Sequence, residues 1–154
     1  MAARAIARMI YTEEPITRLV GLAAGIDIKT RRIAERALLT VGLTYAQFGV
    51  LAAIAERAGP TQRERADLLE TDTNTVMVVC DSLERKGLAA RSEDARDRRV
   101  RRISMSRTGR AALAKGRRIV EDLYRPMASA IPLEEIQKAL PALARVYAYL
   151  KEKE

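Results

Sequence analysis

The chain has 154 residues, of which 48% are hydrophobic and 31% charged, a composition typical of a globular protein with a buried core. It contains no histidine and a single cysteine, so the commonest general base is missing and no intrachain disulfide can form. No apolar run of about 18 residues occurs, so we expect no membrane partner and a cytoplasmic, nucleoid-associated protein.

Basic side chains are concentrated in one part of the chain. Residues 85–118 carry 13 basic and 3 acidic side chains, a net of +10, whereas the whole chain has a formal charge of +8. Such a cluster indicates a nucleic-acid partner more strongly than a high pI alone, because it forms a local patch of positive charge.

Helical spacing dominates the first forty residues. Residues 2–10 can form a short helix. Glu14 and Pro15 have the character of a second helix start, with an acid and a proline in the first turn. Apolar residues then recur with helical periodicity, and we expect this helix to end before Gly42.

Two further helices are predicted between residues 44 and 70. Thr44 and Gln47 have capping-box spacing, and so do Thr61 and Glu64. The predicted apolar face of the first of these helices consists of Phe48, Leu51, Ala52 and Ala55. The dipeptide 59–60, Gly-Pro, should end that helix before the second capping box begins the next.

A helix over residues 74–86 precedes a predicted β-hairpin. Gly87 stands where a C-terminal cap glycine is expected, and residues 88–92 and 100–105 have the character of strands. The loop between them is strongly charged. The buried face of the helix is predicted to contain Val76, Val79, Cys80 and Leu83. We interpret Cys80 as a structural core residue, since it shares this apolar face and has no second cysteine to pair with.

A long helix should follow from Thr108, with Pro126 kinking or ending it, and Pro132 and Pro141 separating two further helical pieces. Two short helices followed by a basic hairpin predict a winged helix-turn-helix core. The fold class is therefore mostly α with a small β-hairpin wing (α+β), flanked by long N- and C-terminal dimerisation helices. The expected domains are 1–42 for N-terminal dimerisation, 43–107 for DNA binding, and 108–154 for completing the dimerisation region.

The helix pair over residues 61–86 supplies the first candidate DNA-binding residues. The second helix of such a pair enters the major groove with its early residues at the base edges, and the first helix can hold a phosphate. An ordinary helical hairpin with capped ends is the alternative interpretation. The candidates are Thr61, Gln62 and Arg63 for phosphate contact, and Thr73, Asn74, Thr75 and Met77 for base contact.

The hairpin supplies the second set of candidates. Five arginines are crowded into this short hairpin, where phosphates would neutralise their mutual repulsion: Arg96, Arg98, Arg99, Arg101 and Arg102. An arginine at a hairpin tip also suits the negative potential of a narrow minor groove, and Asp97 could orient a neighbouring arginine. The alternative is a solvated charged loop.

Two stretches of the chain resemble a known family. SLERKGLAAR (82–91) and DARDRRVRRISMSRTG (94–109) are similar to the end of the recognition helix, the wing and the next helix start of the multiple-antibiotic-resistance regulators, the MarR family. The resemblance implies that Arg99 enters the minor groove with Asp97 as its support, and that the terminal helices pair two subunits on a pseudo-palindrome. One departure is that Met77 and Val78 stand where many relatives have Thr-Arg.

The expected function is a sequence-specific transcriptional regulator, most often a repressor, that binds double-stranded DNA as a homodimer and responds to a small-molecule effector. No effector residues, cofactor or metal site are assigned. An enzyme is disfavoured because no histidine, phosphate loop or activated nucleophile is found. The remaining alternative is a ligand-independent architectural or non-specific nucleic-acid-binding module.

Overall fold

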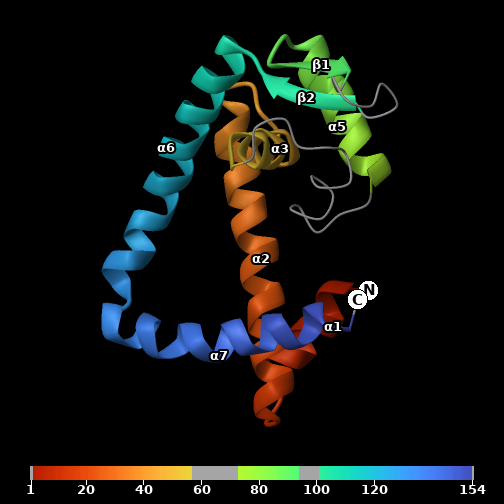
Figure 1. The fold of residues 1–154 in the computed structure, drawn as a ribbon. Coiled ribbons are helices and arrows are strands. Elements are labelled where there is room, and N and C mark those ends of the chain that lie inside the picture. The colour runs from red at the N-terminus through yellow and green to blue at the C-terminus, as the bar shows by residue number, and fades with distance from the viewer. Residues whose placement is uncertain (1, 57–72, 94–100, 154) are drawn as a thin grey trace. The chain divides into compact units, whose positions relative to one another are not determined.

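The computed structural model describes residues 2–56, 73–93 and 101–153. The described chain is mostly helical, with one small antiparallel sheet of two strands, as expected from the sequence (Figure 1). The helices are α1 (Ala2–Ile10), α2 (Pro15–Leu39), α3 (Tyr45–Glu56), α5 (Thr73–Arg85), α6 (Arg107–Ala130) and α7 (Leu133–Lys151), and the strands are β1 (Ala89–Glu93) and β2 (Arg101–Met105).

The chain divides into two compact units, Met1–Ile119 and Val120–Glu154. The first unit holds the described elements from α1 to β2 and the first part of α6. The second holds the end of α6 and all of α7. The three-part division by role, at residues 42 and 107, stays a prediction.

Helix α2 begins and ends where its local sequence predicts. The Glu14 carboxylate accepts hydrogen bonds from the backbone N–H groups of Ile16 and Thr17, with Pro15 in the first turn. The pKa of Glu14 is lowered mainly by its hydrogen bonding to Thr17. After the helix, Gly42 adopts φ +75°, a conformation that favours glycine, and the next N–H, that of Leu43, bonds back to the Leu38 carbonyl at 3.1 Å.

Helix α3 starts with the predicted capping box. The Gln47 N–H bonds to Thr44 Oγ1, and the Thr44 N–H bonds to Gln47 Oε1, both at 3.1 Å. The predicted apolar face was partly wrong, since Ala55 is exposed. Helix α3 is apolar around most of its circumference and packs against α2 on one side and α5 and β2 on others, so spacing alone could not select its buried side. The buried residues are Gln47, Val50, Leu51, Ala53 and Ile54.

The β-hairpin and the start of α6 pack onto the end of α5. Gly87 has φ +66°, and the Leu88 N–H bonds to the Leu83 carbonyl at 2.9 Å, which closes the helix as expected. Strand β1 then pairs antiparallel with β2. Ser106 directly precedes α6 and caps it, because its Oγ accepts the Gly109 N–H at 2.9 Å; the same hydroxyl donates to the Gly87 carbonyl at 2.7 Å.

Prolines interrupt the last two helices less than predicted. Pro126 lies inside α6, which continues to Ala130, and Pro141 lies inside α7, which is one helix rather than two pieces. The expected break at Pro141 was therefore wrong. A proline removes one backbone hydrogen bond but leaves the bonds on either side, so a helix can continue through it where its neighbours favour helix.

The fully buried side chains of the described chain come from the first unit, where they hold α2, α3, α5 and the hairpin together. They include Leu38, Leu43, Val50, Leu51, Val76, Cys80, Leu83 and Ile103. The second unit has no buried residue on α7. The core therefore supports the region predicted to read DNA.

Candidate DNA interface

Helix α5 is the candidate recognition helix, and its inner side is anchored in the core. Val76, Cys80 and Leu83 recur with helical spacing and are 1%, 0% and 0% exposed. This confirms three of the four predicted core residues and shows that the Cys80 thiol is shielded from solvent. Because one side of α5 is fixed, the opposite side is held in a defined orientation.

The outer side of α5 combines polar and apolar side chains. Asn74 and Thr75 are exposed, as are Asp81 and Arg85 further along. Met77 is 40% exposed and Val78 is 65% exposed. Large apolar side chains exposed on a well-anchored helix are suited to contact with thymine methyl groups, while the amide and hydroxyl groups can bond base edges.

A buried glutamine connects α3 to α5. Gln47 is 4% exposed, yet its side chain is well satisfied. Its Nε2 donates to Ser82 Oγ at 2.9 Å, and its Oε1 accepts from Lys86 Nζ at 2.9 Å as well as from the Thr44 N–H. Lys86 Nζ also donates to the Gly42 carbonyl at 2.8 Å, so the end of α5 is tied to the α2–α3 corner.

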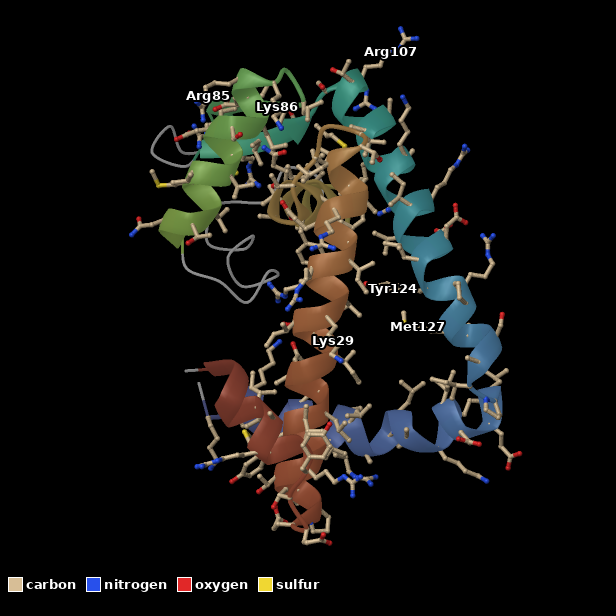
Figure 2. All side chains as sticks on the ribbon, turned by 180° about the vertical axis from the view of Figure 1, so that it is seen from behind. Lys29, Arg85, Lys86, Arg107, Tyr124 and Met127 are labelled. Carbon is tan, nitrogen blue, oxygen red and sulfur yellow. The ribbon has the colours of Figure 1, made fainter. Side chains whose placement is uncertain are left out.

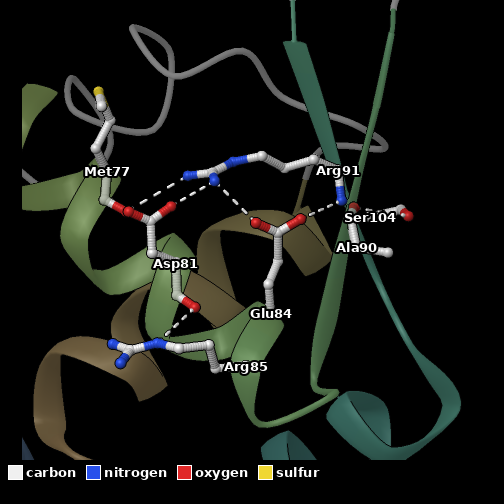
Figure 3. A network of polar contacts seen from close by, with 7 residues as sticks. All are labelled: Met77, Asp81, Glu84, Arg85, Ala90, Arg91 and Ser104. Carbon is white, nitrogen blue, oxygen red and sulfur yellow. Dashed lines mark hydrogen bonds and ion pairs between the residues drawn. The ribbon is translucent and has the colours of Figure 1, made fainter.

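An arginine connects the hairpin to α5 (Figure 3). Arg91 Nη1 forms ion pairs with Asp81 and with Glu84, the latter at 2.8 Å, and Nη2 donates to the Met77 carbonyl at 3.4 Å. The Arg91 backbone N–H donates to Glu84 Oε1 at 2.8 Å. One residue of β1 thus contacts three successive turns of the candidate recognition helix.

The electrostatics of Arg91 follow from this setting. Burial acts to lower the pKa of Arg91, but the hydrogen bond to Asp81 and the negative charges of Glu84 and Asp81 outweigh it, so the pKa is raised. The guanidinium therefore stays charged. Because it is held by two carboxylates, Arg91 contributes to the geometry of the hairpin rather than to a free positive surface.

The basic patch predicted from residues 85–118 accordingly has two parts. Lys86 and Arg91 bind acceptor groups of neighbouring elements, and of the two only Arg91 is partly buried; Arg85 and Arg107 are exposed, as is Lys86 (Figure 2). Arg85 makes a 3.4 Å hydrogen bond from Nε to the Asp81 carbonyl (Figure 3).

Several predicted site residues lie outside the described residues. These are Thr61, Gln62 and Arg63 of the helix pair, and Arg96, Asp97, Arg98 and Arg99 of the wing. Thr73 is the first residue of α5, and its side chain lies outside the described residues too. The structure places Asn74, Thr75 and Met77 together on the outer part of α5, and the DNA-binding roles of all these residues stay predictions.

Sequence reasoning missed the residues that orient α5. Gln47 was identified only as a capping residue, and Asp81, Ser82, Glu84 and Arg91 were not identified as a site at all. The signal for Gln47 was a polar residue inside a strongly apolar helix. For Arg91 the signal was a charged residue two positions after Ala89 in the predicted strand, because alternate residues of a strand share one face and Ala89 is buried.

Two kinds of feature are absent from the described residues. In residues 2–56, 73–93 and 101–153, no helix is long and apolar enough to cross a membrane. Within the same ranges, no group of three or more Asp, Glu, Cys or His side chains is arranged to hold a metal ion.

Comparison with known proteins gives matches in the same region. Residues 41–100 match the model of the MarR family. A protein of Thauera aromatica described as a transcriptional regulatory protein for the hcr operon is 33% identical over 85 residues, 55% of this chain and 51% of that protein. The HTH-type transcriptional repressor MdtR of Bacillus subtilis (strain 168) is 35% identical over 68 residues, 44% of each chain. The chain therefore matches about half of the length of these relatives.

Solved structures extend the likeness over most of the chain. A MarR mutant from E. coli complexed with operator DNA has a TM-score of 0.77 and 25% identity, covering 85% of this chain and 94% of that one. CouR from Rhodococcus jostii RHA1 bound to p-coumaroyl-CoA has the same fold, with a TM-score of 0.75 and 23% identity over 88% of this chain and 95% of that one. Residues 41–100 therefore match the MarR family, and the anchored helix α5 and the two-stranded hairpin agree with the winged-helix fold of its transcriptional regulators.

Proposed function

We propose that this protein is a sequence-specific DNA-binding regulator that acts as a homodimeric repressor on a pseudo-palindromic operator. The observation that carries the proposal is helix α5, which is anchored by Val76, Cys80 and Leu83 and presents Asn74, Met77 and Val78 to solvent. A fixed helix with hydrogen-bonding and methyl-contacting groups on its outer side has the features needed for major-groove readout.

Exposed apolar side chains support the homodimer. On α7, Leu140, Leu143, Tyr147 and Leu150 follow a three-four spacing and are all at least 40% exposed. Tyr124 and Met127, near the end of α6, and Ile131, directly after it, repeat this spacing, and Figure 2 shows Tyr124 and Met127. Stripes of this kind are typical of helices that pack against a partner helix, and a two-fold dimer would place two recognition helices about 34 Å apart.

The dimer is tested by a matched pair of substitutions on α7. Leu143→Glu introduces a charge into the apolar stripe, whereas Gln137→Glu makes the same charge change at an exposed polar position. We expect a dimer mass by light scattering for the wild type and Gln137→Glu, and a concentration-dependent shift to monomer for Leu143→Glu. A monomeric wild type would contradict the dimer.

Sequence-specific binding is tested by selecting bound duplexes from random DNA near physiological salt. A palindromic motif enriched by the wild type supports the proposal, and Thr75→Ala should then change the preferred bases. Salt-sensitive binding without an enriched motif would instead indicate an architectural or non-specific nucleic-acid-binding module.

We further propose that the protein represses transcription and that a small-molecule effector modulates its binding to DNA. Both proposals are supported by the likeness to the repressor MdtR and by the shared fold of CouR, which was crystallised with p-coumaroyl-CoA. The first effector probe is therefore p-coumaroyl-CoA, added to the protein bound to its selected duplex. Release of the duplex would support an effector of the acyl-CoA class, and unchanged affinity would exclude this compound.

A further inference from the structure

Arg91 occupies an unusual place for a charged side chain. Strand β1 pairs Arg91 with Ile103 of β2, and directly opposed residues of an antiparallel pair share one face of the sheet. Ile103 is fully buried on that face and Ala89 is 5% exposed. The Arg91 side chain is itself only 19% exposed. A cation there requires partners, because an unpaired buried charge is costly.

Those partners all belong to the candidate recognition helix. Asp81 and Glu84 supply carboxylates and Met77 supplies a backbone carbonyl, so the contacts run along α5 from its middle towards its end (Figure 3). Two carboxylates on a helix that approaches DNA phosphates would repel the DNA. The Arg91 guanidinium lies against both.

We propose that Arg91 is a positioning residue for DNA binding, which clamps the β1–β2 hairpin to α5 and neutralises the Asp81 and Glu84 carboxylates beside the reading face. The proposal rests on the proposed DNA-binding function. The guanidinium bridges two carboxylates at once, which a planar fork of donors does better than the point charge of a lysine.

The clamp and a purely electrostatic effect predict opposite changes in DNA affinity when the Asp81 carboxylate is removed. Removing the Asp81 carboxylate makes the protein more positive, so electrostatics alone predicts tighter DNA binding. The clamp predicts weaker specific binding, because Arg91 loses one of its two anionic partners. Asp81→Asn keeps an oxygen that can accept from Arg91, whereas Asp81→Ala removes it, so the clamp further predicts that Ala has the larger effect.

The experiment measures the affinity of the full-length protein for two probes. One is the duplex most enriched from random DNA by the wild type, and the other is a shuffled duplex of the same composition. For Asp81→Ala we expect about tenfold weaker binding to the enriched duplex, and no loss on the shuffled duplex. Asp81→Asn should fall between Asp81→Ala and the wild type. Asp122→Ala is the charge-matched control, since Asp122 pairs with Arg125 on an exposed surface of α6, and it should leave both affinities unchanged.

A double mutant completes the test. If the two residues act as one unit, Asp81→Ala combined with Arg91→Gln should bind the enriched duplex no more weakly than Arg91→Gln alone. Arg91→Lys should recover part of the affinity that Arg91→Gln loses. Thermal unfolding of each variant identifies a fold defect, which would weaken binding to both duplexes rather than reduce the preference between them.

Two results would overturn the inference while leaving the proposed function intact. One is equal or tighter binding of Asp81→Ala to the enriched duplex, and the other is strictly additive losses in the double mutant. If no duplex is enriched by the wild type, the proposed function fails and the clamp fails with it.

Discussion

The polar link at Gln47 allows a quantitative prediction about stability. Gln47→Met keeps a similar unbranched side chain in the 4% exposed site but removes three side-chain hydrogen bonds: the one donated to Ser82 Oγ, and the two accepted from Lys86 Nζ and the Thr44 N–H. A hydrogen bond contributes roughly 0.5–1.5 kcal/mol net, and a buried group left without its partner costs more. Lys86 keeps its bond to the Gly42 carbonyl, which limits the loss. We expect the free energy of unfolding to fall by about 2–4 kcal/mol.

The assay is urea unfolding followed by far-UV circular dichroism, at one protomer concentration because the proposed dimer would contribute to apparent stability. Gln137→Met is the matched control on the exposed surface of α7, where we expect a change within about 0.5 kcal/mol. Ser82→Ala combined with Gln47→Met should show a coupling energy of about 1 kcal/mol between the two residues. A Gln47→Met protein within about 0.5 kcal/mol of the wild type would refute the view that this network anchors α5.

Three further predictions follow from single residues. A Cβ atom on Gly109 would lie 2.0 Å from the Leu88 carbonyl oxygen. Gly109→Ala should therefore destabilise the protein by at least about 2 kcal/mol, measured as a lower Tm. An unchanged Tm would contradict the close packing of α6 on the hairpin. Cys80 is fully buried, so its thiol should react with a thiol reagent only on unfolding, and fast reaction of the native protein would show that the core opens. Arg99→Ala should weaken DNA binding without lowering Tm, and should reduce the slope of log affinity against log salt concentration by about 1. Arg145→Ala on α7 should change neither the affinity nor this slope. An unchanged slope for Arg99→Ala would contradict the wing assignment.

Much of the local structure could be predicted because its causes are local. The Thr44–Gln47 capping box and the Glu14 cap lie within three residues of the groups they satisfy. Gly42 and Gly87 end their helices in the left-handed conformation that glycine adopts most easily. These features explain why the helices and the hairpin of the described residues, and the winged-helix class, were confirmed. The helix predicted from Thr61 lies outside the described residues.

The predictions that failed concern competing tendencies. Proline disfavours a helix interior, but Pro141 sits in a segment whose other residues favour helix, and α7 continues through it. Helix α3 is so uniformly apolar that its periodicity does not identify the buried face, and Ala55 is exposed where it was expected inside. The helix preference of the surrounding segment outweighed the single proline, and the packing of neighbouring elements decided which side of α3 is buried.

The sequence by itself determined the caps of α2, α3 and α5 named above, which strands pair, and which stretch carries the positive charge, because each of these depends on residues that are close together in the chain. Only the tertiary structure decided how the candidate reading helix is held. Gln47 and Ser82 are 35 positions apart, and Arg91 and Asp81 belong to a strand and a helix ten positions apart. Such contacts depend on how elements pack in space, and no periodicity along the chain encodes that packing.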